Sequence, residues 1–394
     1  MQKPCRIRSL DGRDVERAMV VFHPAPRSYT GEDLAEISCH GNPLLVDEIM
    51  GIIRSTGLAR PAENGEFTRR AYINGKIDLA QAEGVGALIH AQSTAGIEMA
   101  HSLLDGKLSD TLLKLNSGLL KILSDIEASF IIDEVEAGAD SIAQSLTPLI
   151  HELDSLLEGA QQASHLYSGI ITTIAGLPNA GKSSLFNAVL GYPRAIVHQE
   201  SGTTRDIIRE HLVISGMDFV FHDTAGIRET SSGPEQLGVQ KTMEILQRSH
   251  LVLYVVDASK GLTPDEEQWL SLGQKTIVVM NKADLVQQDL ADTGPPEAIC
   301  VSAKYGRGID GLMEAMVRSF PHNQPKVFIE RHAYLLGRTR ECLANCLKEA
   351  EAQMTPDVLA IDLGAAVQYI LEITGENIVP DILDRIFSKF CVGK

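Results

Sequence analysis

The sequence predicts a multidomain chain of α/β and α+β type, in which an alternating α/β domain is inserted into an all-helical domain and a small α+β domain comes first. Residues 1–70 contain strand-like runs and one segment with helical spacing. Helical periodicity dominates 71–167 and returns over 322–394. Between these helical parts, residues 168–321 carry β-branched apolar runs separated by helix-like or loop-like segments. We therefore expect the C-terminal helices to pack back on the earlier ones.

The N-terminal α+β domain is predicted from three segments. RAMVVF at 17–22 and AEISCHG at 35–41 have the composition of strands, and a loop with prolines and a glycine separates them. Segment 43–57 has apolar residues at the 3.6-residue spacing of a helix and ends at a glycine. Helical spacing with little proline then recurs over 78–166, which predicts long helices.

Composition limits the classes of function. A hydrophobic content of 44% and a charged content of 22% are typical of globular proteins, and 394 residues allow two or three cores. The net charge of −17 argues against a surface that binds nucleic acid everywhere through phosphates. Six scattered cysteines, no leader pattern and no apolar run of spanning length predict a reduced, cytoplasmic protein outside the membrane.

A phosphate-binding loop opens the inserted α/β domain. The run GIITTIAG at 169–176 is typical of a strand buried on both faces, and GLPNAGKS then leads into a helical pattern. Gly176 and Gly181 let backbone N–H groups approach phosphate oxygens. Lys182 can supply a charge at the β- and γ-phosphates, and the Ser183 hydroxyl can bind Mg²⁺. The strand and helix on either side distinguish this P-loop from a glycine-rich linker.

Two later motifs indicate which base is bound. NKAD at 281–284 follows an apolar strand-like run, and SAK at 302–304 follows another. Asp284 can accept hydrogen bonds from the N1 and 2-amino donors of guanine, which adenine does not offer together. The SAK backbone can meet the guanine carbonyl. In this order after a P-loop, the two motifs predict GTP.

The motif DTAG at 223–226 is the remaining nucleotide-binding motif of the inserted domain. Asp223 can hold Mg²⁺ through water, and the Gly226 N–H can sense the γ-phosphate. Thr203 and Thr204 lie between the P-loop and DTAG, where a threonine can complete the Mg²⁺ shell when its loop is ordered. The inserted domain is therefore predicted to be a P-loop, Ras-like GTPase domain.

The predicted hydrolysis machinery differs from that of Ras-like proteins, in which a glutamine after the DTAG glycine orients the attacking water. Ile227 occupies that position here and cannot do so. Glu229 and Glu235 in the same segment are acidic candidates for positioning the water. Asn179 in the P-loop offers a carboxamide oxygen suited to a monovalent cation near the β/γ bridge.

The whole chain resembles the MnmE (TrmE) family of tRNA modification GTPases. SYTGEDLAEISCHGNP, GEFTRRAYINGKIDLAQAEGV, GLPNAGKSSLFNAV, SGTTRD, DTAGIRE, NKAD and the terminal FCVGK occur in family order. The resemblance implies that the N-terminal domain binds tetrahydrofolate and dimerises. It also implies that the two GTPase domains of the homodimer meet when potassium and GTP are bound.

The same resemblance implies an activity and partners. With MnmG, which brings FAD and forms a heterotetramer with it, the family adds a carboxymethylaminomethyl or aminomethyl group to C5 of the wobble uridine of tRNA. The implied one-carbon donor is 5-formyl- or 5,10-methylene-tetrahydrofolate. GTP, Mg²⁺ and K⁺ are the other implied cofactors.

The motifs and the resemblance together imply the following site residues. GTP is expected to contact Asn179, Ala180, Gly181, Lys182, Ser183, Ser184, His198, Gln199, Glu200, Ser201, Gly202, Thr203, Thr204, Asp223, Thr224, Ala225, Gly226, Asn281, Lys282, Ala283, Asp284, Ser302, Ala303 and Lys304. The expected potassium ligands are Asn179, His198, Glu200 and Thr203, and the expected magnesium ligands are Ser183 and Thr204. Glu235 is implied to help position the hydrolytic water.

The resemblance also assigns roles near both ends of the chain. Glu36, Lys76 and Lys394 match folate-contacting positions, and Cys391 matches a cysteine of the modification chemistry. Two other roles for Cys391 stay open. It stands fourth from the end, where a lipid could be attached, although Lys394 is a poor last residue for that signal. It could also be a small buried residue that packs the last helix.

Two departures from the family pattern stand out. His198 and Glu200 replace a hydroxyl residue and a small apolar residue, so potassium coordination is expected to depend on backbone carbonyls. The family also begins with a glycine-rich strand and an arginine that contacts folate, and neither precedes Met1. The N-terminal domain is therefore expected to lack one strand and one folate contact.

Two other functions stay open. One is a GTP-switched assembly factor that binds ribosomal RNA, although such proteins carry a basic module after the GTPase domain and the flanks here are acidic helices. The other is a GTPase without modification activity. The candidates for a tRNA surface are Arg69, Arg70, Arg338 and Arg340.

Overall fold

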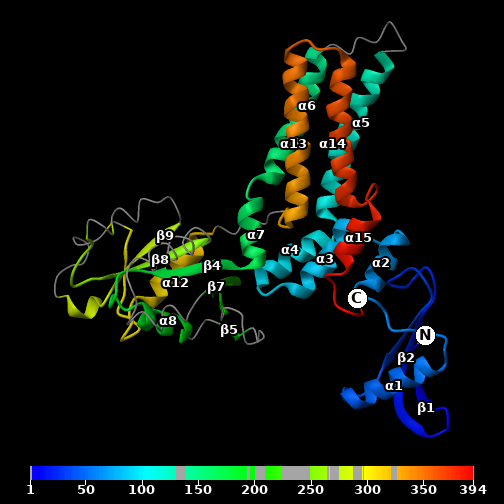
Figure 1. Cartoon of the computed structure of the whole chain (residues 1–394), viewed down its shortest axis with the longest axis horizontal. Coiled ribbons are helices and arrows are strands. Elements are labelled where there is room, and N and C mark those ends of the chain that lie inside the picture. Colours follow the sequence, from blue (N-terminus) through cyan, green and yellow to red (C-terminus); the bar gives the residue numbers. More distant parts are fainter. Residues whose placement is uncertain are drawn as a thin grey trace. The chain divides into compact units, whose positions relative to one another are not determined.

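The structure is a computed structural model and describes residues 2–129, 139–192, 196–199, 209–222, 249–263, 266, 275–286, 295, 297–320 and 326–393. The chain forms two compact units (Figure 1). Unit 1 comprises Met1–Ile89, Ala100–Asp154 and Tyr334–Lys394, and unit 2 comprises His90–Met99 and Ser155–Ala333. The four predicted domain boundaries stay predictions.

The N-terminal part of unit 1 is a three-stranded antiparallel sheet in the order β1-β2-β3. Its strands are β1 (Gln2–Arg8), β2 (Asp14–His23) and β3 (Leu34–Ser38), and α1 (Pro43–Ser55) packs on β2. Both predicted strands and the predicted helix are confirmed. The first strand was not predicted, because QKPCRIR contains a proline and three basic residues, which break the apolar alternation of a strand.

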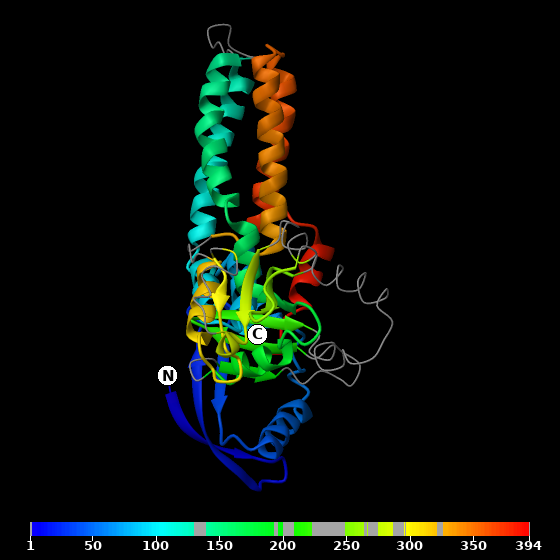
Figure 2. The same cartoon turned by 90° about the vertical axis from the view of Figure 1, so that its left-hand side faces the viewer.

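The rest of unit 1 is helical. The helices that follow the sheet are α2 (Glu66–Ile73), α3 (Leu79–His90), α4 (Thr94–Leu104), α5 (Lys107–Ser129), α6 (Ala139–Leu157), α13 (Glu330–Glu351), α14 (Pro356–Thr374) and α15 (Pro380–Phe387), of which α3, α4, α6 and α13 extend into unit 2. The long helices α5, α6, α13 and α14 run alongside one another (Figures 1 and 2). Contact between α14 and α5 confirms that the C-terminal helices pack back on the earlier ones.

Unit 2 is built on a seven-stranded sheet in the order β10-β9-β8-β4-β7-β6-β5. Its elements are α7 (Ala160–Ser168), β4 (Ile170–Ala175), α8 (Lys182–Leu190), β5 (Ile196–Gln199), β6 (Arg209–Ile214), β7 (Met217–His222), β8 (Leu251–Asp257), β9 (Thr276–Asn281), η1 (Ala283–Leu285), β10 (Ile299–Cys300) and α12 (Ile309–Arg318). The pairs from β10 to β7 are parallel, whereas β6 is antiparallel to β5 and β7.

Aromatic contacts show which helices cover one face of this sheet. Phe186 of α8 meets Phe221 of β7 with ring centroids 5.6 Å apart, and Phe320, just after α12, meets Phe219 at 6.3 Å. Because Phe219 and Phe221 are two residues apart on one strand, α8 and α12 lie on the same face. The carboxyl ends of β4, β8, β9 and β10 meet at one edge of the sheet, where nucleotides bind in such folds.

The predicted fold class is therefore confirmed: an α/β domain with a P-loop is inserted into a helical domain and preceded by a small α+β part. In the part of the chain that the structure describes, no helix has both the length and the apolar run that a membrane span needs.

Candidate functional site

The P-loop joins β4 to α8, and close contacts require glycine at both of its ends. A Cβ on Gly176, whose φ is +141°, would lie 2.2 Å from the carbonyl oxygen of Val255. A Cβ on Gly181, whose φ is +97°, would lie 2.2 Å from Nδ2 of Asn281. These distances exclude any side chain, so the loop can keep its backbone N–H groups accessible to a phosphate.

The charged and hydroxyl residues of the P-loop occupy the first turn of α8. The Lys182 ammonium donates to the carbonyl oxygens of Gly176 and Leu177, both at 3.0 Å, so it lies over the loop. Burial lowers the pKa of Lys182. Ser183 and Ser184 follow on the same turn. This arrangement of a glycine cradle, a lysine and a helix N-terminus fits a nucleotide phosphate chain.

Asn179 lies on the P-loop in the left-handed conformation, with φ at 65°, and is exposed. Asparagine adopts this conformation more readily than most residues. Its predicted role as a potassium ligand stays a prediction, because the structure describes only the backbone of His198 and neither Glu200 nor Thr203.

The predicted guanine motif is tied to the P-loop through its asparagine. Asn281 is buried, and its Nδ2 donates to the carbonyl oxygen of Ala180 at 3.0 Å. Its Oδ1 accepts from the backbone N–H of Ala303 at 3.1 Å. One side chain therefore connects three predicted motifs, the P-loop, NKAD and SAK.

Asp284, the predicted reader of the base, is held from the SAK side. The Ser302 hydroxyl donates to Oδ1 of Asp284 at 2.5 Å, and the Ala283 N–H donates to the Val301 carbonyl at 3.1 Å. Ser302 is buried, whereas Asp284 stays exposed. Lys304 is also exposed and lies over the Tyr305 ring, 5.1 Å from its centroid. The carboxylate is thus oriented and accessible, as a guanine-binding group must be.

A carboxylate that sequence reasoning missed holds the lysine of the same motif. Lys282 has a left-handed backbone with φ at 63°, and its ammonium lies 2.7 Å from Oδ2 of Asp257. Asp257 ends β8, which is one of the apolar runs that the sequence predicts as strands between 168 and 321. The available signal was an aspartate at the carboxyl end of a buried parallel strand, at the edge that carries the site.

The C-terminal tail is bound to the loop before α2, within unit 1. Asn64 and Val392 form an isolated antiparallel bridge, and the Gly65 N–H donates to the Cys391 carbonyl at 3.3 Å. The Asn64 side chain donates to the Ser388 carbonyl at 3.2 Å. The backbone on either side of Cys391 is therefore held in place.

Phe390, and not Cys391, is the residue that the tail buries. Phe390 is 6% exposed and lies against Phe387, Leu79 and Ala82, whereas Cys391 is exposed. The expectation that Cys391 is a small buried residue is therefore wrong, because its neighbour supplies the apolar contact. The thiol stays accessible to a reagent or substrate.

Two glycines make room for Phe390. A Cβ on Gly65 would lie 2.9 Å from the Phe387 carbonyl and 3.0 Å from the Phe390 Cβ. A Cβ on Gly86 of α3 would lie 3.1 Å from the Phe390 ring. The ring therefore occupies a slot that side chains at these two positions would narrow.

The two described folate candidates lie on different elements. Glu36 is on β3, with its carboxylate 3.5 Å from Nε2 of His23. The Lys76 ammonium donates to the Pro26 carbonyl at 3.1 Å, and its stem lies beside Gly31. These contacts do not test folate binding, which stays a prediction.

Comparison with known sequences decides the family. The model of the MnmE helical domain matches residues 79–391, and the model of the GTP-binding protein TrmE N-terminus matches 3–76. The tRNA modification GTPase MnmE of Heliobacterium modesticaldum is 39% identical over 406 aligned positions, covering 98% of this chain and 87% of that protein. The Aquifex aeolicus protein of the same name is 36% identical, covering 97% and 88%. The chain belongs to the MnmE family of tRNA modification GTPases.

A solved structure was also compared with this MnmE-family chain. The G domain of the Thermotoga maritima FeoB iron transporter is 23% identical and covers 38% of this chain and 97% of that one, with a TM-score of 0.27.

Several residues that the motifs or the MnmE resemblance assign to the site lie outside the described part of the chain. These are Glu200, Ser201, Gly202, Thr203, Thr204, Asp223, Thr224, Ala225, Gly226, Glu229, Glu235 and Lys394, and Ile227, which takes the place of the Ras glutamine, lies outside it as well. His198 and Gln199 belong to the edge strand β5, of which the backbone alone is described. Their roles stay predictions.

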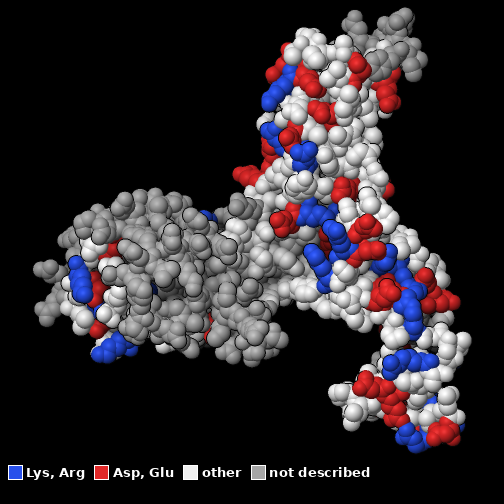
Figure 3. Space-filling model, viewed as in Figure 1, with Lys and Arg blue, Asp and Glu red and all other residues white. Residues whose placement is uncertain are grey.

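The arginines considered for a tRNA surface of this MnmE-family chain are all ion-paired. Arg69 lies 2.8 Å from Asp384, Arg70 2.7 Å from Glu66, Arg338 2.6 Å from Glu341 and Arg340 2.8 Å from Asp154. Acidic and basic side chains are interspersed over the described helices (Figure 3). The pairing does not favour these arginines as phosphate contacts.

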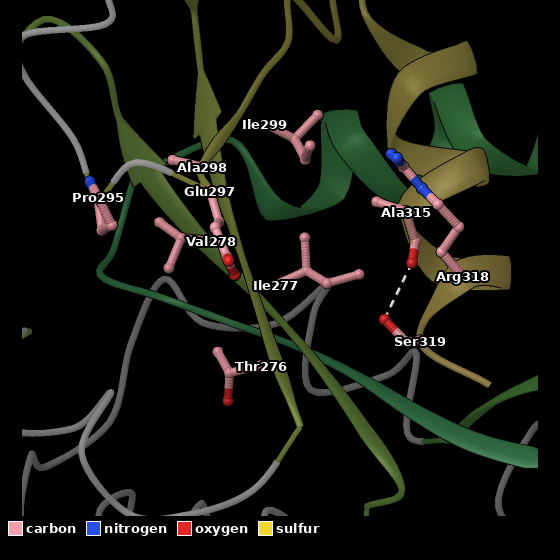
Figure 4. A pocket seen from close by; sticks show the side chains of 10 residues that line it. All are labelled: Thr276, Ile277, Val278, Pro295, Glu297, Ala298, Ile299, Ala315, Arg318 and Ser319. Atoms are coloured by element: carbon pink, nitrogen blue, oxygen red, sulfur yellow. Dashed lines mark hydrogen bonds between the residues drawn. The ribbon is translucent and has the colours of Figure 1, made fainter. Parts of the chain in front are cut away.

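A cavity of about 700 Å³ lies in unit 2, at the end of the seven-stranded sheet away from the nucleotide motifs (Figure 4). Thr276 and Val278 of β9, Ile299 of β10 and Arg318 of α12 are among its lining residues. It is at the amino end of β9, whereas NKAD follows the carboxyl end. The cavity is therefore no part of the nucleotide site.

Proposed function

We propose that this chain is a potassium-dependent GTPase that hydrolyses GTP to GDP and phosphate and acts with MnmG on tRNA. In this proposal it is a cytoplasmic homodimer, and the complex adds a carboxymethylaminomethyl or aminomethyl group to C5 of the wobble uridine. Tetrahydrofolate donates the one-carbon unit, and MnmG brings FAD. Membership of the MnmE family over nearly the whole chain supports this proposal.

The observation that supports GTP binding most strongly is the contact between the P-loop, NKAD and SAK. Asn281 joins the P-loop carbonyl of Ala180 to the SAK N–H of Ala303, while Ser302 orients Asp284. The P-loop would hold the phosphates and Asp284 the guanine edge. Magnesium, bound through Ser183, would neutralise phosphate charge, and potassium at Asn179 would add positive charge near the β/γ bridge.

GTP turnover in K⁺ and in Na⁺ tests the hydrolytic part. We expect turnover to be at least about tenfold faster in K⁺, because a monovalent cation takes the place of an arginine finger. Asn179→Ala should remove this difference and keep the Na⁺ rate. Asn187→Ala, an exposed asparagine on α8, is the matched control. Equal rates of the wild type in both salts would contradict the potassium assignment.

Two further measurements test the modification part. Equilibrium dialysis with formyl-tetrahydrofolate should show binding to the wild type and weaker binding to Lys76→Ala.

In a reaction reconstituted with MnmG and tRNA, Cys391→Ser should abolish modification and leave GTP turnover unchanged. Cys300→Ser, also an exposed thiol, is the control. Full modification by the Cys391 variant would remove the thiol from the chemistry.

A further inference from the structure

Asp257 and the guanine motif are brought together by sheet pairing. In the parallel pair of β8 and β9, Asp257 lies opposite Asn281. The Ala258 N–H donates to the Asn281 carbonyl at 2.8 Å, which continues the pairing past the end of β8. The residue after Asn281 is Lys282, so its side chain starts beside the Asp257 carboxylate. This proximity follows from the register of the sheet and does not need a flexible loop.

Both oxygens of Asp257 are engaged. Oδ2 accepts from the Lys282 ammonium at 2.7 Å, and Oδ1 accepts from the N–H of Ser259 at 3.1 Å and from its hydroxyl at 2.6 Å. Burial disfavours the charged form of Asp257, but the hydrogen bonds from Lys282 and Ser259 outweigh it and lower its pKa. The carboxylate is therefore ionised at neutral pH and fixed in orientation.

The lysine gains its position from this pair. The Lys282 side chain is 32% exposed and the Asp257 side chain 11%, so the pair is shielded on one side. A left-handed backbone is unfavourable at a lysine, and a free lysine side chain has many rotamers. The ion pair limits those rotamers to the one that points at the Asp257 carboxylate. The stem then runs beside the P-loop, because a Cβ placed on Gly181 would lie 4.0 Å from the Lys282 Cε.

We propose that Asp257 is a positioning residue for guanine nucleotide binding, because it holds the Lys282 stem as one wall of the base site. This proposal rests on the proposed GTP binding and deepens it. Asn281 is held by the P-loop and Asp284 by SAK, and Asp257 performs the same task for the third side chain of the motif. The methylene chain of a lysine held in one rotamer can pack on a face of a purine, whereas a mobile chain would lose conformational entropy on doing so.

A double-mutant cycle on GDP affinity tests the proposal. The dissociation constant for a fluorescent GDP is measured for the wild type, Asp257→Asn, Lys282→Met and the double variant. Methionine keeps an apolar stem and removes the charge. We expect Asp257→Asn to weaken binding about tenfold in the wild type and less than about twofold in the Lys282→Met background. Glu314→Gln, an exposed charge on α12, is the control and should change nothing.

Steady-state kinetics separate positioning from a structural role. Because Lys282 would meet the base and not the phosphates, Asp257→Asn should raise KM for GTP about tenfold and change kcat less than about twofold. A collapse of kcat, or an equal loss of GDP affinity with and without Lys282, would overturn the role of Asp257. No GDP binding by the wild type would overturn the GTPase proposal itself.

Discussion

Glu66, the first residue of α2, lies at the centre of a charge network in unit 1. Arg60 donates to both of its oxygens, at 2.8 and 2.9 Å, and Arg70 donates to one of them at 2.7 Å. The Glu63 N–H adds a fourth hydrogen bond at 2.8 Å. Hydrogen bonds from Arg60, then Glu63 and Arg70, lower the pKa of Glu66 from 4.5 to about 2. Glu66 therefore stabilises the loop that receives the C-terminal tail.

The lowered pKa predicts how stability depends on pH. An ionised Glu66 contributes fully above pH 4.5, and this contribution is lost as the pH falls from 4.5 through about 2. At pH 7 we expect Glu66→Gln to lower the thermal midpoint by roughly 2–6 °C, which corresponds to a loss of about 1–2 kcal/mol in the free energy of unfolding.

Melting curves at several pH values would check this, with Glu63→Gln as a control that removes an exposed charge and keeps the backbone bond. The difference between the wild type and Glu66→Gln should shrink toward pH 2. A difference that stays constant with pH would show that the effect is steric and not electrostatic.

Gly181 allows a second prediction at a single residue. An added methyl group would meet Nδ2 of Asn281 at 2.2 Å, at a φ of +97° that alanine rarely adopts. Gly181→Ala should weaken GDP binding by roughly a hundredfold, since strain of this kind costs about 1–3 kcal/mol. Gly311→Ala, with open space around it, is the control for a fluorescence titration. Unchanged affinity would mean that Asn281 can move away from the loop without loss.

The sequence predicts those site residues that belong to a short motif and misses the one that acts through a neighbouring strand. Asn281, Asp284 and Ser302 were predicted because each belongs to a short motif whose chemistry is local. Asp257 was missed because the aspartate that ends a buried strand was the only signal, and on its own it does not separate a site residue from a solvated strand end. Only the parallel register of β8 and β9 shows that it reaches Lys282.

At the scale of secondary structure elements, continuous apolar runs predicted the central parallel strands, and apolar periodicity predicted the long helices. Both signals failed for β1, β5 and β6, whose sequences QKPCRIR, IVHQ and REHLVI mix polar or charged residues with apolar ones. Periodicity also carries no information on contacts between distant elements. The slot that binds Phe390 is formed by α3 and the loop before α2, which are far from the tail in sequence.

The tail and α3 give a prediction at this scale. Trypsin cleavage after Lys389 should be slow in the wild type, because Phe390 is buried and the next residues are hydrogen-bonded. Gly86→Val places branched atoms where a Cβ is already 3.1 Å from the ring, so cleavage there should become roughly tenfold faster.

Mass spectrometry of the released C-terminal peptide would measure this rate. Gly364→Val is the matched control, because it also places valine inside a helix of unit 1 but has open space around it. Equal release from both variants would mean that the slot does not hold the tail.

For the whole molecule, net charge and ion pairing bear on tRNA binding. The chain carries a net charge of −17, and Arg338 and Arg340 are each paired with a carboxylate. We expect Arg338→Ala and Arg340→Ala to change the tRNA affinity of the chain without MnmG by less than about twofold. Filter binding at two salt concentrations would check this. A tenfold loss with a shallower salt dependence would instead identify these arginines as phosphate contacts.

The contact between Phe390 and its two glycines also has an evolutionary consequence. Positions 65, 86 and 390 share one small volume, so a substitution at one changes what the other two can accept. Relatives with a smaller residue at the position of Phe390 should tolerate side chains at the positions of Gly65 and Gly86, and relatives that keep phenylalanine should not. Covariation among these three positions in related sequences would therefore show whether the tail is anchored in the same way in those relatives.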